Sequence, residues 1–151
     1  MSSVRKSLQR AYDEAETIPF NAASKFVIMS DCHRGQGNNS DNFLPNQNLF
    51  FSALEHYYDE GFTYIELGDG DELWENRRMC PIIAAHSDAF WMMSKFYREN
   101  RLYMLYGNHD VVKSRKSFAK KHCSDYYCDS TGCCVPLFPG IRIHQSLILE
   151  D

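Results

Sequence analysis

The sequence predicts an α/β domain built around a mostly parallel β-sheet. Three observations support this fold class: short apolar runs typical of buried strands, helical segments between those runs, and turns rich in Gly, Asp and Asn at the strand ends. The resulting order, strand–helix–strand–helix–strand–helix–strand, favours parallel strands joined by right-handed crossovers. The 151 residues are 44% hydrophobic and 14% aromatic, which suffices for one domain with a real core.

The first expected element is an amphipathic helix from Ser3 to Glu16, where apolar residues recur at helical spacing. Pro19 ends this helix because proline cannot continue it. We therefore expect residues 1–24 to form a helix and a lead-in, and residues 25–151 to form the domain itself.

Two strands and the helix between them come next. Lys25–Ser30 is a short β-branched and apolar run, which indicates a buried strand, and a polar loop follows it. Residues 46–60 read as a helix, with Gly61 well placed just past its end. Phe62–Leu67 is the second strand.

The rest of the chain continues the alternation. A helical tendency runs from Glu72 to Asn100, with an interruption expected at Pro81. Arg101–Tyr106 is the third strand and a basic helix covers Val111–His122. A Cys/Gly/Pro-rich stretch then leads into a last strand, Ile141–Leu149.

Composition and charge exclude several classes of protein. Sixteen basic and twenty acidic side chains give a net charge of -4, which offers no reason to expect nucleic acid or an anionic membrane as partner. No apolar run approaches the roughly 18 residues of a membrane-spanning helix. The first residues lack a signal-peptide core, so we expect a cytoplasmic protein. Four of the six cysteines lie within residues 123–134; reduced thiols are expected, and zinc is a weaker alternative because no CxxC pair is present.

Polar clusters follow each of the first three strands. Because the carboxyl ends of parallel strands meet at one edge of a sheet, ligands gather there. The three clusters are Asp31-Cys32-His33, Gly68-Asp69-Gly70-Asp71-Glu72 and Gly107-Asn108-His109-Asp110.

The residue types in these clusters suit metal binding. Asp31 and His33 are two apart, so on an extended segment they share a face and can reach one metal; the alternative is a loop Asp beside an unrelated His. Asp69 leaves its strand at a tight glycine turn, and one carboxylate can bridge two cations about 3.5–4 Å apart. The alternative for this cluster is a helix cap, a role that fits Asp71 better.

The third cluster adds a neutral ligand and a proton donor. Asn108 offers a carbonyl oxygen, and His109 can donate a hydrogen bond or a proton to a phosphate ester oxygen. The alternative is an ordinary Asn/His turn.

Taken together, D-x-H, GDxxE and GNHD, each closing a strand, resemble the calcineurin-like metallophosphoesterase superfamily. The resemblance covers about residues 25–122. Within the superfamily, the sequence looks like the bacterial branch that includes the UDP-diacylglucosamine hydrolases. It implies the N-terminal half of a four-layer αββα sandwich. It also implies that Asp31 and His33 bind the first of two divalent ions, that Asp69 bridges both, and that Asn108 binds the second.

The resemblance further implies a reaction. His109 would be the catalytic histidine beside the leaving group, and Asp110 would orient it. A metal-bound hydroxide would hydrolyse a phosphomonoester, phosphodiester or pyrophosphate of a small-molecule or nucleotide-linked substrate. Mixed oxygen and nitrogen ligands favour Mn²⁺, with Fe or Zn²⁺ as alternatives.

Family members carry further ligands downstream, in a Gly-His pair and a His-x-His. After His109 only His122 and His144 remain, neither in such a unit, and His144 reads as a strand residue. We therefore expect a fragment with a weak second metal site and little or no turnover of its own. The alternatives are a non-catalytic metal- or phosphate-binding module and a plain α/β domain with coincidental motifs.

Two other features have ordinary interpretations. The basic run between Lys113 and Lys121 can attract an anionic substrate but is more often a solvated helix face. We expect Trp74, Phe90 and Trp91 to pack in the core.

Overall fold

The structure, a computed structural model, describes residues 3–151; residues 1 and 2, which begin the expected N-terminal segment, lie outside the described residues. The elements in chain order are α1 (Ser3–Asp13), β1 (Glu16–Pro19), β2 (Phe26–Met29), the 3₁₀ helix η1 (Leu44–Asn46), α2 (Gln47–Asp59), β3 (Thr63–Leu67), α3 (Met79–Ala85), α4 (Ser87–Arg98), β4 (Leu102–Leu105), the 3₁₀ helix η2 (Val111–Ser114), α5 (Phe118–His122), β5 (Asp125–Cys128), β6 (Cys133–Pro136), β7 (Ile143–His144) and β8 (Leu147–Glu150). The predicted α/β class is thus confirmed.

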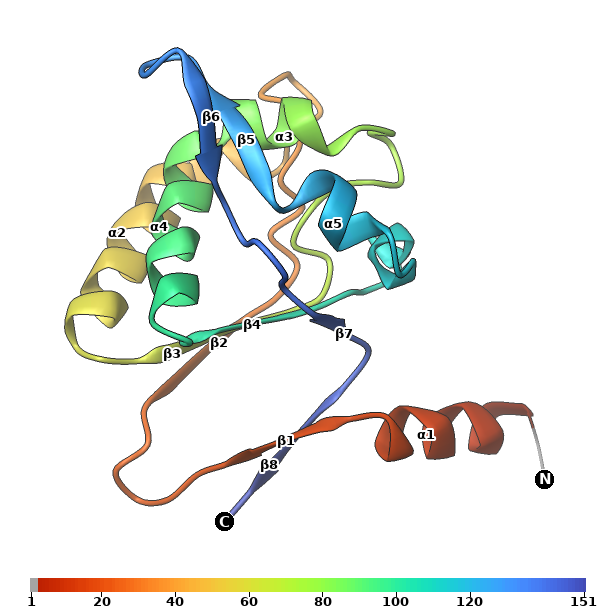
Figure 1. Ribbon diagram of the computed structural model, residues 1–151. Helices are drawn as coiled ribbons and strands as arrows, with labels where there is room; N and C mark the ends of the chain where they lie inside the picture. Colours follow the sequence, from red (N-terminus) through yellow and green to blue (C-terminus); the bar gives the residue numbers. More distant parts are fainter. Residues whose placement is uncertain (1–2) are drawn as a thin grey trace.

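The central sheet has four parallel strands in the order β2-β3-β4-β7. The three strands expected from the apolar runs are β2, β3 and β4, and they lie next to one another in chain order. Right-handed crossovers between strands that are added in one direction put every connecting helix on the same face of a sheet. Figure 1 shows this arrangement: α2, α3, α4 and α5 lie on one side of the sheet, and α1 lies on the other with β1 and β8.

The hydrophobic core fills the space between the sheet and α2 and α4. Leu54 of α2 and Tyr64 of β3 are fully buried in it. Helix α4 contributes the largest share, because its apolar residues recur at helical spacing: Ala89, Phe90, Met92, Met93 and Phe96. The opposite face of the sheet is less covered, since Ile28 is 50% exposed and Leu67 is 52% exposed.

The prediction that three large aromatic residues pack in the core is right for Phe90 and wrong for both tryptophans. Trp91 follows Phe90 on α4 and therefore points to another side of the helix, where it stacks on Phe51 at 6.3 Å between ring centroids. Trp74 lies in a turn that precedes α3 and is 68% exposed.

Three predicted helices are shorter than the sequence indicates. Helix α1 ends at Asp13, and the predicted end at Glu16 is wrong because Glu16 begins β1. The helix expected from Glu72 begins only at Met79, because Glu72 holds a turn in which its backbone oxygen accepts hydrogen bonds from Asn76. Pro81 does not interrupt α3; it lies in the first turn, where its missing N–H would have had no partner in the helix. The basic helix expected over Val111–His122 is two short pieces, η2 and α5.

The ends of the described chain form a separate small sheet. The last expected strand is two strands, β7 and β8, and β8 pairs in parallel with β1, where the sequence indicated only a lead-in. Ser146 donates a hydrogen bond to the carbonyl oxygen of Ala11 at 2.6 Å. Helix α1 has no buried residue, and its apolar side chains Val4, Leu8 and Tyr12 are exposed.

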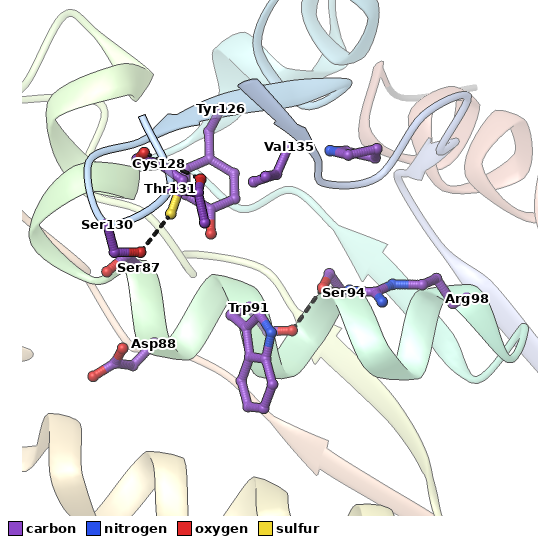
Figure 2. Close-up of a pocket in the computed structure, with 11 residues that line it drawn as sticks. Ser87, Asp88, Trp91, Ser94, Arg98, Tyr126, Cys128, Ser130, Thr131 and Val135 are labelled. Atoms are coloured by element: carbon purple, nitrogen blue, oxygen red, sulfur yellow. Dashed lines mark hydrogen bonds between the residues drawn. The ribbon is translucent and has the colours of Figure 1, made fainter. Parts of the chain in front are cut away.

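The four clustered cysteines belong to the region of the β5–β6 hairpin, in which Cys128 and Cys133 lie opposite each other. All six cysteines are free thiols. A cavity of about 530 Å³ lies between this hairpin and α4, with Trp91, Arg98, Tyr126 and Cys128 among its walls (Figure 2). No helix within residues 3–151 is long and apolar enough to cross a membrane.

Candidate functional site

The three polar clusters meet at the carboxyl edge of the central sheet. The loops after β2 and β3 remain hydrogen-bonded beyond the strands, because Asp31 N–H donates to Gly68 O at 3.2 Å and His33 N–H donates to Asp69 O at 2.9 Å. The loop after β4 joins them, since His109 N–H donates to Asp69 Oδ1 at 2.7 Å. The side chains that the sequence singles out therefore lie together on a cross-linked framework.

Asp31, His33 and Asp69 form a group that could hold a metal ion. One ligand atom from each lies within 4.8 Å of the others, and His33 Nε2 is 3.7 Å from Asp31 Oδ1. A divalent ion with ligand bonds of about 2.0–2.2 Å holds two donors up to about 4.4 Å apart, and the pair from His33 and Asp31 is within this limit. Two carboxylates and one imidazole are also a donor set that Mn²⁺, Fe and Zn²⁺ accept. These residues therefore fit the first ion that the resemblance implies.

The backbone at this group is left-handed, so the prediction that Asp31 and His33 lie on an extended segment is wrong. Asp31, His33 and Asp69 have φ angles of 54°, 49° and 51°, in the left-handed region. Asn100 is the only other non-glycine residue among those described that shares it. This conformation costs roughly 1–2 kcal/mol per residue, and such outliers cluster at active sites and ligand clamps.

Glycine is required where the loops after β3 and β4 come closest. Gly107 lies against the Asp69 carboxylate, and a Cβ atom at position 107 would overlap with that carboxylate. A side chain at position 107 would therefore push Asp69 away from its neighbours.

Glu72 is a central site residue to which sequence reasoning gave no role. Its Oε2 lies 3.0 Å from His33 Nδ1 and 2.8 Å from His109 Nδ1, and the two imidazole rings meet edge to face at 4.6 Å. With Nδ1 of each ring donating to this carboxylate, both Nε2 atoms are free for other partners. Its signal in the sequence was the last letter of GDxxE. His33, Glu72 and His109 are also close enough to form an alternative metal-binding group.

The hydrogen bonds of Glu72 shift two pKa values. They raise the pKa of His109 above its ordinary value, chiefly because the Glu72 carboxylate accepts the imidazole proton. Burial opposes the charge of Glu72, but the hydrogen bonds from His109 and His33 outweigh it and lower the pKa of this carboxyl. The pair therefore favours an anionic carboxylate beside a protonated ring.

Asp110 does not have the partner that the sequence suggests. It was expected to orient His109, but its Oδ1 accepts backbone hydrogen bonds from Gly107 at 2.6 Å and Asp69 at 3.3 Å. Its Oδ2 lies 2.6 Å from Lys113 Nζ. Adjacent side chains in this loop point to different sides, so Asp110 faces the interior while the ring of His109 reaches Glu72.

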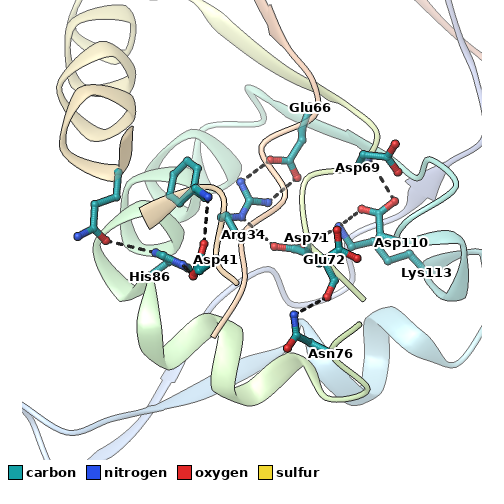
Figure 3. A network of polar contacts seen from close by, with 12 residues as sticks. Arg34, Asp41, Glu66, Asp69, Asp71, Glu72, Asn76, His86, Asp110 and Lys113 are labelled. Carbon is teal, nitrogen blue, oxygen red and sulfur yellow. Dashed lines mark hydrogen bonds and ion pairs between the residues drawn. The ribbon is translucent and has the colours of Figure 1, made fainter. Parts of the chain in front are cut away.

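Beneath the site lies a network of five fully buried charged side chains (Figure 3). Arg34 donates to both oxygens of Glu66, at 2.7 and 2.9 Å, and to Asp71 Oδ1 at 2.8 Å. Lys113 Nζ lies 2.7 Å from Asp71 Oδ2 and 2.6 Å from Asp110 Oδ2, as ion pairs that lack the alignment of hydrogen bonds. The network joins the loops after all three strands.

Asp71 belongs to this network and is not the helix cap that the sequence suggested. Burial opposes its charge, yet Arg34 and Lys113 together lower the pKa of Asp71 to about 2. Asp71 and Asp110 in turn raise the pKa of Lys113 despite its burial. Both groups therefore stay charged, and Lys113 is no part of a solvated helix face, although Lys116, Lys120 and Lys121 are exposed.

The remaining candidates lie apart from the first donor group. Asn108 is exposed and lines a cavity of about 330 Å³ together with His109 and Trp74. His144 is a strand residue, as expected; it is buried in β7 and lies 3.4 Å from Glu16. Within residues 3–151, neither potential metal-binding group contains a cysteine, His122 or His144.

No protein-family model, curated protein or solved structure matches the chain. Fold and site alone therefore define it, as an α/β protein with two overlapping groups of potential metal ligands near the carboxyl ends of parallel strands.

Proposed function

We propose that this chain is a metal-dependent phosphoester hydrolase of the calcineurin-like type. The observation that carries the proposal is the meeting of Asp31, His33 and Asp69 within 4.8 Å at one sheet edge, with His109 beside them. A structural domain with coincidental motifs has no need for three site residues in left-handed backbone, or for a buried carboxylate that contacts two histidines.

The donor atoms of Asp31, His33 and Asp69 support a shared role, because these residues would hold the first ion. The resemblance implies that Asp69 and Asn108 would hold the second. When bound, divalent ions supply an activated water and neutralise the charge of a phosphate group. Mn²⁺ suits the mixed oxygen and nitrogen donors, as do Fe and Zn²⁺.

His109 provides the proton in this proposal. Its Nδ1 proton is held by Glu72, so Nε2 is the nitrogen that faces a substrate and protonates the leaving oxygen. Glu72 thereby takes the orienting role that the sequence suggested for Asp110. Because Glu72 also holds Nδ1 of His33, it presents Nε2 of that ring to the first ion.

The fold supports a place for this chain within an αββα sandwich. Helices cover one face of the sheet, whereas Ile28 and Leu67 on the other face are half exposed. A second sheet packed on that face would bury these side chains and complete the four layers.

The first test is metal binding. Isothermal titration with Mn²⁺ is expected to find one tight site and one weak site, because the second site draws on Asp69 and Asn108 alone. Asp31→Ala should abolish the tight site, while Asp59→Ala, at an exposed position of α2, should leave it intact. Unchanged Mn²⁺ binding in Asp31→Ala would contradict the assignment.

The second test is turnover. Hydrolysis of bis(p-nitrophenyl) phosphate, p-nitrophenyl phosphate and a UDP-sugar by the Mn²⁺-loaded chain should be weak, and His109→Ala should remove it. The alternative function, a non-catalytic metal- or phosphate-binding module, is favoured by the exposure of Asn108, the proposed ligand of the second ion. That alternative predicts metal binding with no turnover that depends on His109.

A further inference from the structure

Trp74 is exposed where a tryptophan would ordinarily be buried. Its side chain is 68% exposed, and its ring lies 5.1 Å from that of His109 at an angle of 52°. The other tryptophan, Trp91, is stacked on Phe51 and lies near the ammonium group of Lys95. Aromatic rings lose much favourable burial when left open, so an exposed one beside a candidate catalytic histidine calls for a partner.

Trp74 is part of a small apolar surface. A cavity of about 330 Å³ is lined by Leu73, Trp74, Val111 and Val112, which we call the Trp74 shelf, and by Asn108 and His109 at its polar end. Small-molecule sites have this composition, an apolar wall with a few polar groups that fix orientation. Asn108 and His109 belong to the candidate metal site, so the Trp74 shelf adjoins that site.

The shelf is held in place by the residue that holds His109. Glu72 Oε1 accepts a hydrogen bond from Glu75 N–H at 3.3 Å, and Glu72 O accepts one from the Asn76 side chain at 2.8 Å. These contacts close the turn that carries Trp74. One carboxylate therefore positions both the proton donor and the ring beside it.

We propose that the Trp74 shelf receives a planar aromatic leaving group, so that the substrates are phosphate esters of aromatic or heteroaromatic alcohols. This inference rests on the proposed function, in which His109 lies beside the leaving oxygen. A flat ring attached to that oxygen would reach the indole of Trp74, where offset or edge-to-face contact is favourable. A hydroxyl-rich leaving group would lose water there and gain few hydrogen-bond partners, because three of the four shelf side chains are aliphatic and Trp74 offers only its indole N–H.

The two tryptophans make the test specific. In a Trp91→Phe chain, Trp74 is the sole tryptophan, so its fluorescence reports on the shelf alone. Addition of phenyl phosphate to this Mn²⁺-loaded chain should change the fluorescence saturably, and inorganic phosphate should change it less. In the matched Trp74→Phe chain, the emission of Trp91 should not respond.

Affinities complete the experiment. Isothermal titration of the Mn²⁺-loaded chain should find phenyl phosphate bound about three- to tenfold more tightly than inorganic phosphate, the range expected for one aromatic contact. Cyclohexyl phosphate, apolar but not flat, should bind more weakly than phenyl phosphate. Trp74→Leu should lose the preference for the phenyl ester with Mn²⁺ binding intact, and Trp91→Leu should keep it.

The outcomes separate the two proposals. If the chain binds neither Mn²⁺ nor phosphate, the proposed function fails and the shelf fails with it. If Mn²⁺ and phosphate bind but phenyl phosphate has no advantage, only the shelf is overturned. Equal affinity for the phenyl and cyclohexyl esters would overturn the aromatic assignment. Val111→Ser, at a shelf position that is 55% exposed, gives a second variant and should weaken the preference without unfolding the chain.

Discussion

Glu72 contacts both histidines of the candidate site, although the sequence suggested no role for it. It accepts from both histidines through its side chain and closes the turn that carries Trp74. Three of the expected site residues, Asp31, His33 and Asp69, are brought together as the strand-end rule predicts. The role of Glu72 was not predicted because it depends on where two distant loops place their imidazole rings. Residue spacing does not encode that placement.

Replacing Glu72 tests its positioning role. Glu72→Gln keeps the shape but removes the charge, so both histidines lose the carboxylate that accepts their Nδ1 protons. Loss of such a partner typically lowers metal affinity by about 10–100-fold, and isothermal titration with Mn²⁺ should detect this drop. Glu75→Gln, three residues away and exposed, is the matched control and should bind Mn²⁺ normally. Equal affinities in the two variants would argue against the role.

Cysteine reactivity should follow the local hydrogen bonds. Contacts with Ser130 and Thr131 lower the pKa of Cys128 to about 7, whereas burial raises the pKa of Cys123 to about 12. The thiolate is the reactive form, so alkylation of Cys128 by iodoacetamide should accelerate as the pH rises through about 7, with Cys123 unmodified in the native protein. Peptide mass spectrometry measures both rates. In Ser130→Ala the midpoint should move up toward the ordinary value; an unchanged midpoint would exclude this hydrogen bond as the cause.

At the scale of elements, the buried network joins the loops that follow three strands of the central sheet. Strand positions followed from apolar runs, because local sequence decides which segments are buried in a parallel sheet. The helix boundaries were less well predicted, since Glu72 and Lys113 leave the helical pattern to make contacts with residues that are distant in sequence. A lysine that looks like part of a basic surface is therefore one of the most buried charges in the protein.

Removal of Lys113 should destabilise the fold. Lys113→Met leaves Asp71 and Asp110 buried with one cation fewer, and breaking a buried ion pair on one side costs about 3–5 kcal/mol. Urea unfolding monitored by circular dichroism measures the loss. Lys116→Met removes an equal charge from an exposed position and should change the free energy of unfolding by less than about 0.5 kcal/mol. A similar stability for both variants would show that the network contributes little.

At the scale of the whole molecule, the described residues form a central core and a small sheet outside it. The central sheet and α2 and α4 share one core, whereas β1 and β8 form a two-stranded sheet with α1 exposed beside it. The pairing of β1 with β8 joins residues more than a hundred positions apart, such as Glu16 with Leu147. No local pattern indicates such a partner, which is why the sequence suggested only a lead-in there.

Hydrogen exchange should reveal this division. Isolated two-stranded sheets are marginally stable, so the backbone amides of β1 and β8 should exchange much faster than those of β3 and β4, which have partners on both sides. Mass spectrometry of peptic fragments measures the rates at each segment. Equal protection in β1 and β3 would mean that the small sheet unfolds only with the core.

The left-handed backbone at Asp31, His33 and Asp69 has a consequence for how the sequence can change. Glycine adopts this conformation without strain, so glycine at any one of the three positions should ease folding by an amount on the order of 1 kcal/mol while deleting a donor. Selection for thermal resistance alone would drive these positions toward glycine, and selection for metal binding would hold them. At these three positions, greater stability and the proposed metal binding therefore favour different residues.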